Sequence, residues 1–303
     1  MTDLLATMSE ARGRFMELVA EVRPELHRYC ARMTGSVFDG EDVVQETLAK
    51  AYYALAEMES PPPLRPWLFR IAYNTAMDFL RRYENRNVES TADMEVVADM
   101  TGSAETEARG PDEERVEAAL TVFAALPPVQ RSALALKDVL GLSLEETAAT
   151  MNVSVAAVKG ALTRARANVG AASASGATRG EVVEVQRLRR YADLFNAHDW
   201  EALRALFGEE TRLDVVSRYQ RHGPSASQYF TRYGEIAPRE DLRAVAGWVD
   251  GVPAIAVFRP ASSRVPAYFV RIDWRDDRVA HVRDFRYVPY IAGDATFRAA
   301  GSR

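Results

Sequence analysis

The sequence has few of the residues that covalent cross-links, metal centres and membrane spans require. Cys30 is the single cysteine among 303 residues, so no disulfide can form within the chain and a cysteine-based zinc site is not expected. No run approaches the roughly 20 apolar residues that cross a bilayer. Residues 1–20 carry Asp3, Glu10 and Glu17, where a signal peptide would be apolar. We therefore expect a cytoplasmic protein with no membrane contact, no metal and no cofactor.

Charge is unevenly distributed along the chain. The net charge of −5 argues weakly against a nucleic-acid partner, but residues 87–114 alone hold nine acidic residues and one base, Arg109. Residues 65–86 hold five arginines against two acidic residues, and residues 154–172 carry only bases. The pattern predicts two locally basic helical segments separated by an acidic, flexible linker.

Residues 12–83 have the apolar periodicity of helices, with breaks expected at Gly35, at Gly40 and at a run of prolines. A helix capped by Asp39 is expected to bury one face and expose the other. The residues expected to face inward are Val43, Val44, Leu48, Ala51, Tyr52 and Leu55. Those expected to face outward are Glu41, Gln45, Glu46 and Lys50. A further helix beginning near Pro66 would complete a small bundle.

The second helical segment, after the acidic linker, has strong local signals. Gly141 suits the left-handed end of a helix, and Ser143 with Glu146 forms a capping box that begins the next one. Asn152 is expected to make the turn at positive φ, with Ser154 capping the helix that follows. Two helices joined by so tight a turn form a helix-turn-helix.

The helix that begins after Ser154 turns a polar, small-residue face outward. Small side chains at its start would let the backbone approach the major groove, and its longer polar side chains could reach base edges or phosphates. From periodicity alone, an ordinary amphipathic helix in a helical hairpin remains the alternative. The outward residues are Ala156, Ala157, Lys159, Gly160, Thr163, Arg164 and Arg166.

The last third of the chain changes character. A linker of small residues at 172–180 precedes two helical stretches, 182–197 and 200–206. Alternating strands are expected at 212–216, 254–258, 267–274 and 278–287. Helices followed by an antiparallel meander predict an α+β domain over 181–290, with a tail at 291–303.

Three runs resemble one known family, in that family's order. Residues 125–166, which begin Ala-Leu-Pro-Pro-Val-Gln-Arg and end Thr-Arg-Ala-Arg, resemble the minus-35-reading domain of extracytoplasmic-function (ECF) sigma factors of the sigma-70 family. Asp39-Gly-Glu-Asp-Val-Val-Gln-Glu resembles the helix with which the family docks on the clamp helices of the polymerase largest subunit. Trp67-Leu-Phe-Arg-Ile-Ala-Tyr-Asn resembles its minus-10-melting helix. The resemblance covers about residues 12–170.

The resemblance implies a factor that binds core RNA polymerase and directs it to promoter DNA. Residues 12–86 would form an all-α region-2 domain and residues 115–171 an all-α region-4 domain. The residues expected to bind core polymerase are Asp42, Gln45, Glu46, Ala49 and Lys50. Those expected at the minus-10 element are Arg70, Tyr73, Asn74, Arg81 and Arg82. Ser154 and the outward residues of its helix are expected at the minus-35 element. Trp67 and Phe69 could hold unstacked bases or could be core residues.

The C-terminal third is similar to SnoaL-like domains, which are cone-shaped α+β folds. Tyr191 to Phe207 carries the likeness at its start, and Val279 to Tyr287 carries it at its end. The resemblance implies a fused domain that modulates the sigma factor, through intramolecular contact with the sigma domains or through an unidentified small ligand. The alternative is a SnoaL-like enzyme or ligand sensor with an attached DNA-binding module.

An enzyme in this domain would need acid–base groups aimed into the cone. The available groups are Asp214, His222, Tyr229, Tyr233, His281 and Asp284. His281 and Asp284 should lie on opposite faces of one regular strand, because their spacing is odd. We expect these groups to be solvated or structurally hydrogen-bonded, and the protein not to be an enzyme.

Overall fold

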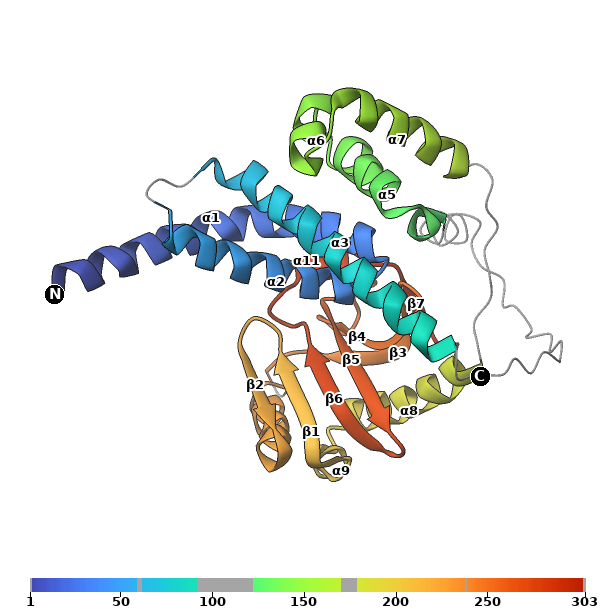
Figure 1. Cartoon of the computed structure of the whole chain (residues 1–303). Coiled ribbons are helices and arrows are strands. Elements are labelled where there is room, and N and C mark those ends of the chain that lie inside the picture. The colour runs from blue at the N-terminus through green and yellow to red at the C-terminus, as the bar shows by residue number, and fades with distance from the viewer. Residues whose placement is uncertain (1, 59–61, 92–121, 170–178, 238, 302–303) are drawn as a thin grey trace. The chain divides into compact units, whose positions relative to one another are not determined.

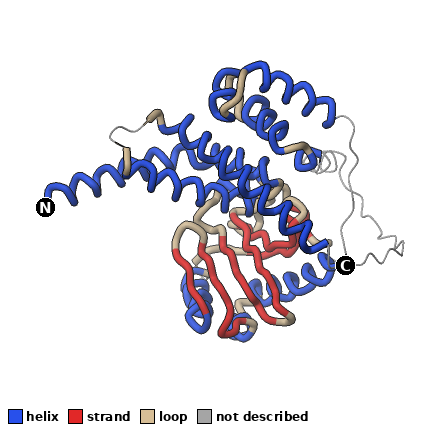
Figure 2. The backbone as a smooth tube through the Cα atoms, viewed as in Figure 1, coloured by secondary structure: helices blue, strands red, loops and turns tan. Residues whose placement is uncertain are grey.

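The structure, a computed structural model, divides into two compact units (Figure 1). Unit 1 is residues 1–174 and unit 2 is residues 175–303. Figure 2 shows helices throughout the described part of unit 1, whereas the strands belong to unit 2. No helix among the described residues is long and apolar enough to cross a membrane. The residues that the structure describes are 2–58, 62–91, 122–169, 179–237 and 239–301.

Unit 1 begins with three packed helices, α1 (Thr2–Thr34), α2 (Val37–Ala56) and α3 (Leu64–Thr91). Helix α3 continues through the first residues of the predicted acidic linker, up to residue 91. The rest of that linker, 92–114, lies outside the described residues.

The start of α2 differs from the sequence expectation at two residues. Ser36 is the N-cap, because its Oγ accepts hydrogen bonds from the backbone N–H groups of Phe38 and Asp39 at 3.2 and 3.4 Å. The cap expected at Asp39 is therefore wrong. The break expected at Gly40 is also wrong: Gly40 lies inside α2 where it crosses α1, and a Cβ there would stand 2.6 Å from backbone atoms of Ala31. Only a hydrogen fits between the two helices.

The helix-turn-helix segment completes unit 1. Its helices are α5 (Pro128–Leu134), α6 (Leu144–Met151) and α7 (Val155–Val169), and a π-helical turn, η1 (Ala135–Val139), continues α5. Gly141 has φ +72°, as expected for a residue that ends a helix in the left-handed region.

The three-helix bundle and the helix-turn-helix segment share one hydrophobic core. Leu26, Met33 and Leu68 belong to the same buried cluster as Leu136 and Leu162. The bundle residues and the helix-turn-helix residues lie far apart in the sequence. Their packing is therefore a tertiary contact that a local sequence pattern does not reveal. The two segments thus belong to one compact unit of the structure.

Two buried polar contacts join these segments. The Tyr29 hydroxyl and the Ser132 Oγ lie 2.8 Å apart, linking α1 to α5. The Arg131 side chain donates to the carbonyl of Met33 at the end of α1, and also to the carbonyls of Ala124 and Leu126 just before α5. Arg131 is only 7% exposed. A buried guanidinium is tolerated because carbonyl oxygens accept its hydrogens.

Unit 2 is an α+β domain built on one mixed sheet. The strand order is β2-β1-β6-β5-β4-β3-β7, with β1 and β6 parallel and the other pairs antiparallel. The strands are β1 (Phe207–Val215), β2 (Tyr219–His222), β3 (Arg243–Val249), β4 (Val252–Phe258), β5 (Tyr268–Arg275), β6 (Arg278–Asp284) and β7 (Phe297–Ala299). The helices are α8 (Arg179–Asn196), α9 (Trp200–Ala205), α10 (Tyr229–Ile236) and α11 (Tyr290–Asp294), and η2 (Gly223–Gln228) is a 3₁₀ turn.

The main core of unit 2 lies between one face of this sheet and the helices. Leu213, Ile272 and Val282 on the strands pack with Leu188 and Phe230 from the helices. We call this the inner face of the sheet. Side chains at alternate positions lie on the outer face. The fold class, helical domains followed by an α+β domain, is confirmed.

The chain beyond residue 290 is ordered into α11 and β7, not a simple tail. Strand β7 pairs with β3, with Gly247 opposite Ala299. A Cβ at Gly247 would stand 2.2 Å from the carbonyl oxygen of Arg298. This close approach explains a glycine in the middle of β3 and places the end of the chain in the sheet.

We predict that Gly40→Ala destabilises unit 1 by about 1–3 kcal/mol, because an added methyl forces α1 and α2 apart. Denaturant unfolding followed by circular dichroism measures the change. Gly293→Ala is the control, since a Cβ there meets nothing within 4 Å. Equal stability of the two variants would contradict the close helix crossing.

Candidate nucleic-acid and partner interfaces

The turn between α6 and α7 has the geometry that the sequence predicts. The Ser143 N–H donates to the Glu146 carboxylate at 2.7 Å, and the Glu146 N–H donates to the Ser143 Oγ at 3.0 Å. Asn152 has φ +52° and ψ +49°, in the left-handed region. Ser154 then accepts a hydrogen bond from the N–H of Ala157 at 3.2 Å. The helix-turn-helix is confirmed, and these caps fix where α7 begins.

Helix α7 has a clean division between a buried and an exposed face. Val158, Ala161, Leu162 and Ala165 are buried in the shared core. The predicted contact residues Ala156, Ala157, Lys159, Thr163 and Arg164 are exposed, and Gly160 is half-buried. No acidic residue occurs in α7. The exposed face therefore has small side chains at the start of the helix and basic side chains farther along, and it can approach a polyanion.

Arg166 differs from the other predicted contacts. Its guanidinium makes a two-pronged ion pair with the Asp138 carboxylate of η1, with N–O distances of 2.9–3.2 Å. The pair braces the end of α7 against the π-helical turn. Arg166 therefore carries less uncompensated charge than Arg164, for which no ion-pair partner occurs among the described residues.

Helix α3 exposes part of the predicted minus-10 set. Arg70 and Asn74 are exposed one helical turn apart, and Tyr73 is half-buried beside them. Phe69 is 1% exposed and packs edge-on against Tyr29 at 5.8 Å between ring centroids. Phe69 is thus a core residue. Trp67 is half-buried and packs against the same core.

Two further arginines of α3 form exposed ion pairs. Arg81 pairs with Asp78 at 3.2 Å, and Arg82 pairs with Glu46 of α2 at 2.9 Å. Exposed pairs of this kind contribute only ~0–1 kcal/mol, so both guanidiniums can exchange their partners for phosphate.

Helix α2 brings together the residues predicted to bind polymerase. Asp42, Gln45 and Glu46 are half-exposed, and Ala49 and Lys50 are exposed on the same helical face. The Glu46 carboxylate accepts from Lys50 at 2.8 Å and from Arg82 at 2.9 Å. Partial burial raises the pKa of Glu46, but these two cations more than compensate and hold it below its ordinary value. Glu46 is therefore ionised at neutral pH.

Two residues of α2 do not face as predicted. Glu41 is fully buried, where Arg23 of α1 pairs with it and the Gln45 amide donates to it at 3.4 Å. Tyr52, expected inside, is 44% exposed. Sequence reasoning also missed Tyr53, which is 74% exposed and continues the face of Ala49 and Lys50 by one turn. The i+3 and i+4 spacing from those two residues was the signal for it.

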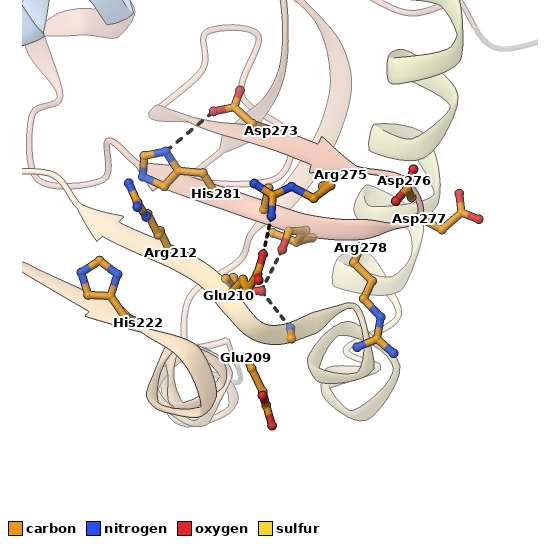
Figure 3. A pocket seen from close by; sticks show the side chains of 14 residues that line it. Glu209, Glu210, Arg212, His222, Asp273, Arg275, Asp276, Asp277, Arg278 and His281 are labelled. Carbon is orange, nitrogen blue, oxygen red and sulfur yellow. Dashed lines mark hydrogen bonds and ion pairs between the residues drawn. The ribbon is translucent and has the colours of Figure 1, made fainter.

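The acid–base residues of unit 2 separate onto the two faces of the sheet. On the outer face, register places His281 beside Arg212 of β1 and Asp273 of β5. The His281 Nδ1 lies 3.7 Å from the Asp273 carboxylate, and burial lowers the pKa of His281. Figure 3 shows these side chains with His222 around an open hollow.

Asp284 lies on the inner face and is 1% exposed. Its carboxylate accepts hydrogen bonds from the hydroxyls of Tyr229 and Tyr233 at 2.7 and 3.0 Å. It also accepts one from the backbone N–H of Arg286 at 2.8 Å. Burial raises the pKa of Asp284, and these donors offset part of that rise. The expected opposite placement of His281 and Asp284 is confirmed. Asp284 is held by structural hydrogen bonds, as expected.

Comparison with known proteins decides the family. The family model for sigma-70 region 2 matches residues 18–86, and the model for sigma-70 region 4 matches residues 117–169. The ECF RNA polymerase sigma factor SigG of Mycobacterium tuberculosis H37Rv is 31% identical over 304 residues, across 91% of this chain and 82% of SigG. The chain belongs to the ECF sigma factors. This sigma factor therefore acts in transcription initiation, with core RNA polymerase at promoter DNA, and is not an enzyme.

Further similar proteins cover different shares of this sigma factor. CnrH of Cupriavidus metallidurans is 33% identical over 142 residues, across 44% of this chain and 72% of CnrH. The solved structure of CnrH with the cytosolic domain of CnrY covers 55% of this chain and 93% of that chain at 29% identity, with a TM-score of 0.38. The solved structure of Mycobacterium tuberculosis SigJ covers 89% of this chain and 95% of the SigJ chain at 21% identity, with a TM-score of 0.35. TM-scores this low do not establish a shared overall arrangement.

We predict that Asp284→Ala destabilises unit 2 of the sigma factor by about 2–4 kcal/mol, because two hydroxyls and one N–H lose a buried acceptor. Asp214→Ala, on the outer face of neighbouring β1, should cost less than about 0.5 kcal/mol. Thermal unfolding of both variants makes the comparison. Similar melting temperatures would show that the Asp284 network adds nothing.

Proposed function

We propose that this sigma factor reads the minus-35 element with α7, reads the minus-10 element with α3 and docks on core polymerase with α2. The observation that carries the proposal is the outward face of α7. It is capped and oriented by the turn at Asn152, lacks acidic residues, and presents Lys159, Thr163 and Arg164 to solvent. Such a face suits the major groove of DNA.

Arg164→Ala tests the minus-35 face, with Arg166→Ala as the matched control on the same helix. If Arg164 reads a base, promoter binding should weaken by about 1–3 kcal/mol and preference should relax at one position. If it touches phosphate, binding should weaken on all sequences and the salt slope should shrink by about one. Fluorescence anisotropy with promoter fragments at several salt concentrations measures both.

The control separates the two arginines by their surroundings. Arg166→Ala loses a guanidinium that Asp138 already neutralises, so its effect on DNA binding should be smaller than that of Arg164→Ala. An Arg164→Ala variant with wild-type affinity and wild-type salt dependence would remove α7 from the proposed interface.

The minus-10 surface combines charge with an amide. Arg70 attracts phosphate, while Asn74 presents an amide that can read a base edge one turn away. Arg81 and Arg82 would add phosphate contacts once their exposed ion pairs exchange. Tyr73 can stack on an unpaired base from its half-buried position.

The polymerase face follows one side of α2 from Asp42 to Tyr53. It carries charges that form pairs among themselves and ends in an exposed aromatic ring. Exposed aromatic side chains beside polar ones are typical of the centre of a protein interface. We include Tyr53 in this face because it continues the helical stripe.

Glu46→Lys combined with Lys50→Glu tests this face, because the pair keeps its net charge but reverses its polarity. Affinity for core polymerase should fall at least about tenfold, as should that of Tyr53→Ala. Glu17→Lys, an exposed change on α1, is the control. Quantitative pull-down gives the affinities, and circular dichroism shows that the bundle remains folded. Unchanged affinity of both test variants would remove this face from the proposal.

The packing within unit 1 adds a conformational requirement. The described residues of unit 1 are 2–58, 62–91 and 122–169. A compact body of that size has a radius of gyration of about 14 Å. Elements centred at −35 and −10 lie about 25 base pairs apart, which is about 85 Å of B-DNA at 3.4 Å per pair. The contacts of Arg131 and Tyr29 between the two segments must therefore part in the initiation complex.

We also propose that unit 2, as a SnoaL-like domain, modulates the activity of the sigma part. The support is that unit 2 has a hydrophobic core of its own and continues the same chain. A linked domain acts at high effective concentration without rigid attachment. Its action could shift the sigma part between closed and polymerase-competent states.

Truncation after residue 175 tests this role. Promoter-dependent transcription should change several-fold, while unit 1 keeps its helical signal because its core is complete without unit 2. Run-off transcription with core polymerase, at matched protein concentration and over a range of salt, makes the measurement. Equal transcription by the full-length and truncated proteins would remove the modulating role.

A further inference from the structure

Unit 2 contains a pocket of about 370 Å³ beside α10 that no step above uses. Its size is near the lower end of the range for small-molecule sites, so it fits a ligand of about one ring. We call it the arginine pocket. It is lined by Arg232, Ile236, Glu240, Arg259, Arg286 and Tyr287.

The pocket has more positive than negative charge. Glu240 is its single acidic residue, and it accepts two hydrogen bonds from Arg286 at 2.7 and 2.8 Å. Arg259 shares that carboxylate at a longer 3.4 Å. Arg232 is exposed on α10 and has no ion-pair partner among the described residues. Asp284, below the pocket, also interacts electrostatically with Arg286. Two carboxylates therefore stand against three guanidiniums, and the excess positive charge lies with Arg232 and Arg259.

The geometry also limits where a ligand can lie. Below the pocket, between α10 and Asp284, the free volume is only about 10 Å³, which is room for about one water molecule. The rings of Tyr229 and Tyr233 fill that space and bond to Asp284. A ligand is thus confined to the arginine pocket itself, against the apolar side chain of Ile236 and the ring of Tyr287.

The larger hollow in unit 2 has the opposite character. It measures about 970 Å³ on the outer face of the sheet (Figure 3), and its acidic side chains outnumber its arginines by five to three. Three of its acidic groups are paired: Glu210 with Arg275, Asp273 with Arg271 and His281, and Asp277 with Arg187. It has no excess of positive charge for an anion, so its Arg212 supplies a matched control.

We propose that the arginine pocket binds a small organic carboxylate with a flat, apolar body. Guanidinium groups present paired donors that match the two oxygens of a carboxylate. The structure already holds one carboxylate there, that of Glu240, in contact with two arginines. A ligand carboxylate would lie beside Arg232 and Arg259, where the excess positive charge is, with its body against Ile236 and Tyr287.

The test uses the full-length protein and three probes, benzoate, the neutral isostere benzamide and inorganic phosphate, titrated by isothermal calorimetry. No polymerase or DNA is present, so the result is independent of the proposed modulating role. Benzoate should bind saturably, and benzamide and phosphate at least about tenfold more weakly. Phosphate lacks the apolar body that the pocket accommodates.

Variants then locate the site. Arg232→Gln and Arg259→Gln should each weaken benzoate roughly three- to tenfold, while Glu240→Gln should tighten it because a competing negative charge is removed. Arg212→Gln, in the outer hollow, should leave benzoate binding unchanged. Thermal unfolding confirms that each variant is folded.

The proposal would be overturned if benzoate showed no saturable binding up to about 10 mM; a Kd of that size corresponds to a binding free energy of only ~2.7 kcal/mol. Equal affinity for benzoate and benzamide, or for benzoate and phosphate, would also overturn it. So would an Arg212→Gln variant that weakens benzoate binding as much as Arg232→Gln does. Opposite effects of the Arg232 and Glu240 variants, with a silent Arg212 variant, would support it.

Discussion

The arrangement of the helical unit depends on the hydrogen bonds that the buried guanidinium of Arg131 donates. It donates to the carbonyl of Met33, 98 residues away in sequence, and to two carbonyls just before its own helix. The Met33 carbonyl belongs to the last turn of α1, where carbonyls lack helical partners and carry negative partial charge. Burial lowers the pKa of Arg131, because the charged form is hard to desolvate. Parting the two segments would hydrate this guanidinium but would also expose the apolar core that they share, so a partner such as polymerase would have to supply binding free energy.

The exposed contacts of the same unit are of a different kind. Glu46 joins the predicted polymerase face to the predicted minus-10 face, because it pairs with both Lys50 and Arg82. These pairs are solvent-exposed, so their contribution is small and their partners can change. The structure thus combines a stable buried connection between α1 and α5 with surface charges that remain available. Docking on polymerase at Glu46 would release Arg82 for phosphate, which links the two binding events through one carboxylate.

Local signals in the sequence predicted the parts of the fold that local physics determines. The capping box at Ser143 and the left-handed turn at Asn152 depend on residues within a few positions, and both were predicted correctly. The roles of Gly40 and Glu41 were not predicted, because both depend on contacts with α1. Ala31 leaves no room for a Cβ at position 40, and Arg23 pairs with the buried carboxylate of Glu41. Periodicity assigns a charged residue to solvent by default. The shared core and the Arg131 contact join segments far apart in the chain, so no window of the sequence contains them.

The distance between the two halves of unit 1, before and after polymerase binding, tests this account most directly. Spin labels at Glu21→Cys on α1 and Ala167→Cys on α7 would report it, since both positions are exposed and native Cys30 is fully buried. Pulsed electron resonance should give one narrow distance below about 40 Å in the free protein, as a compact body of this size requires. With core polymerase and promoter DNA the distance should lengthen by tens of ångströms, on the order of the promoter spacing. A broad, long distribution in the free protein, or an unchanged distance in the initiation complex, would contradict the account.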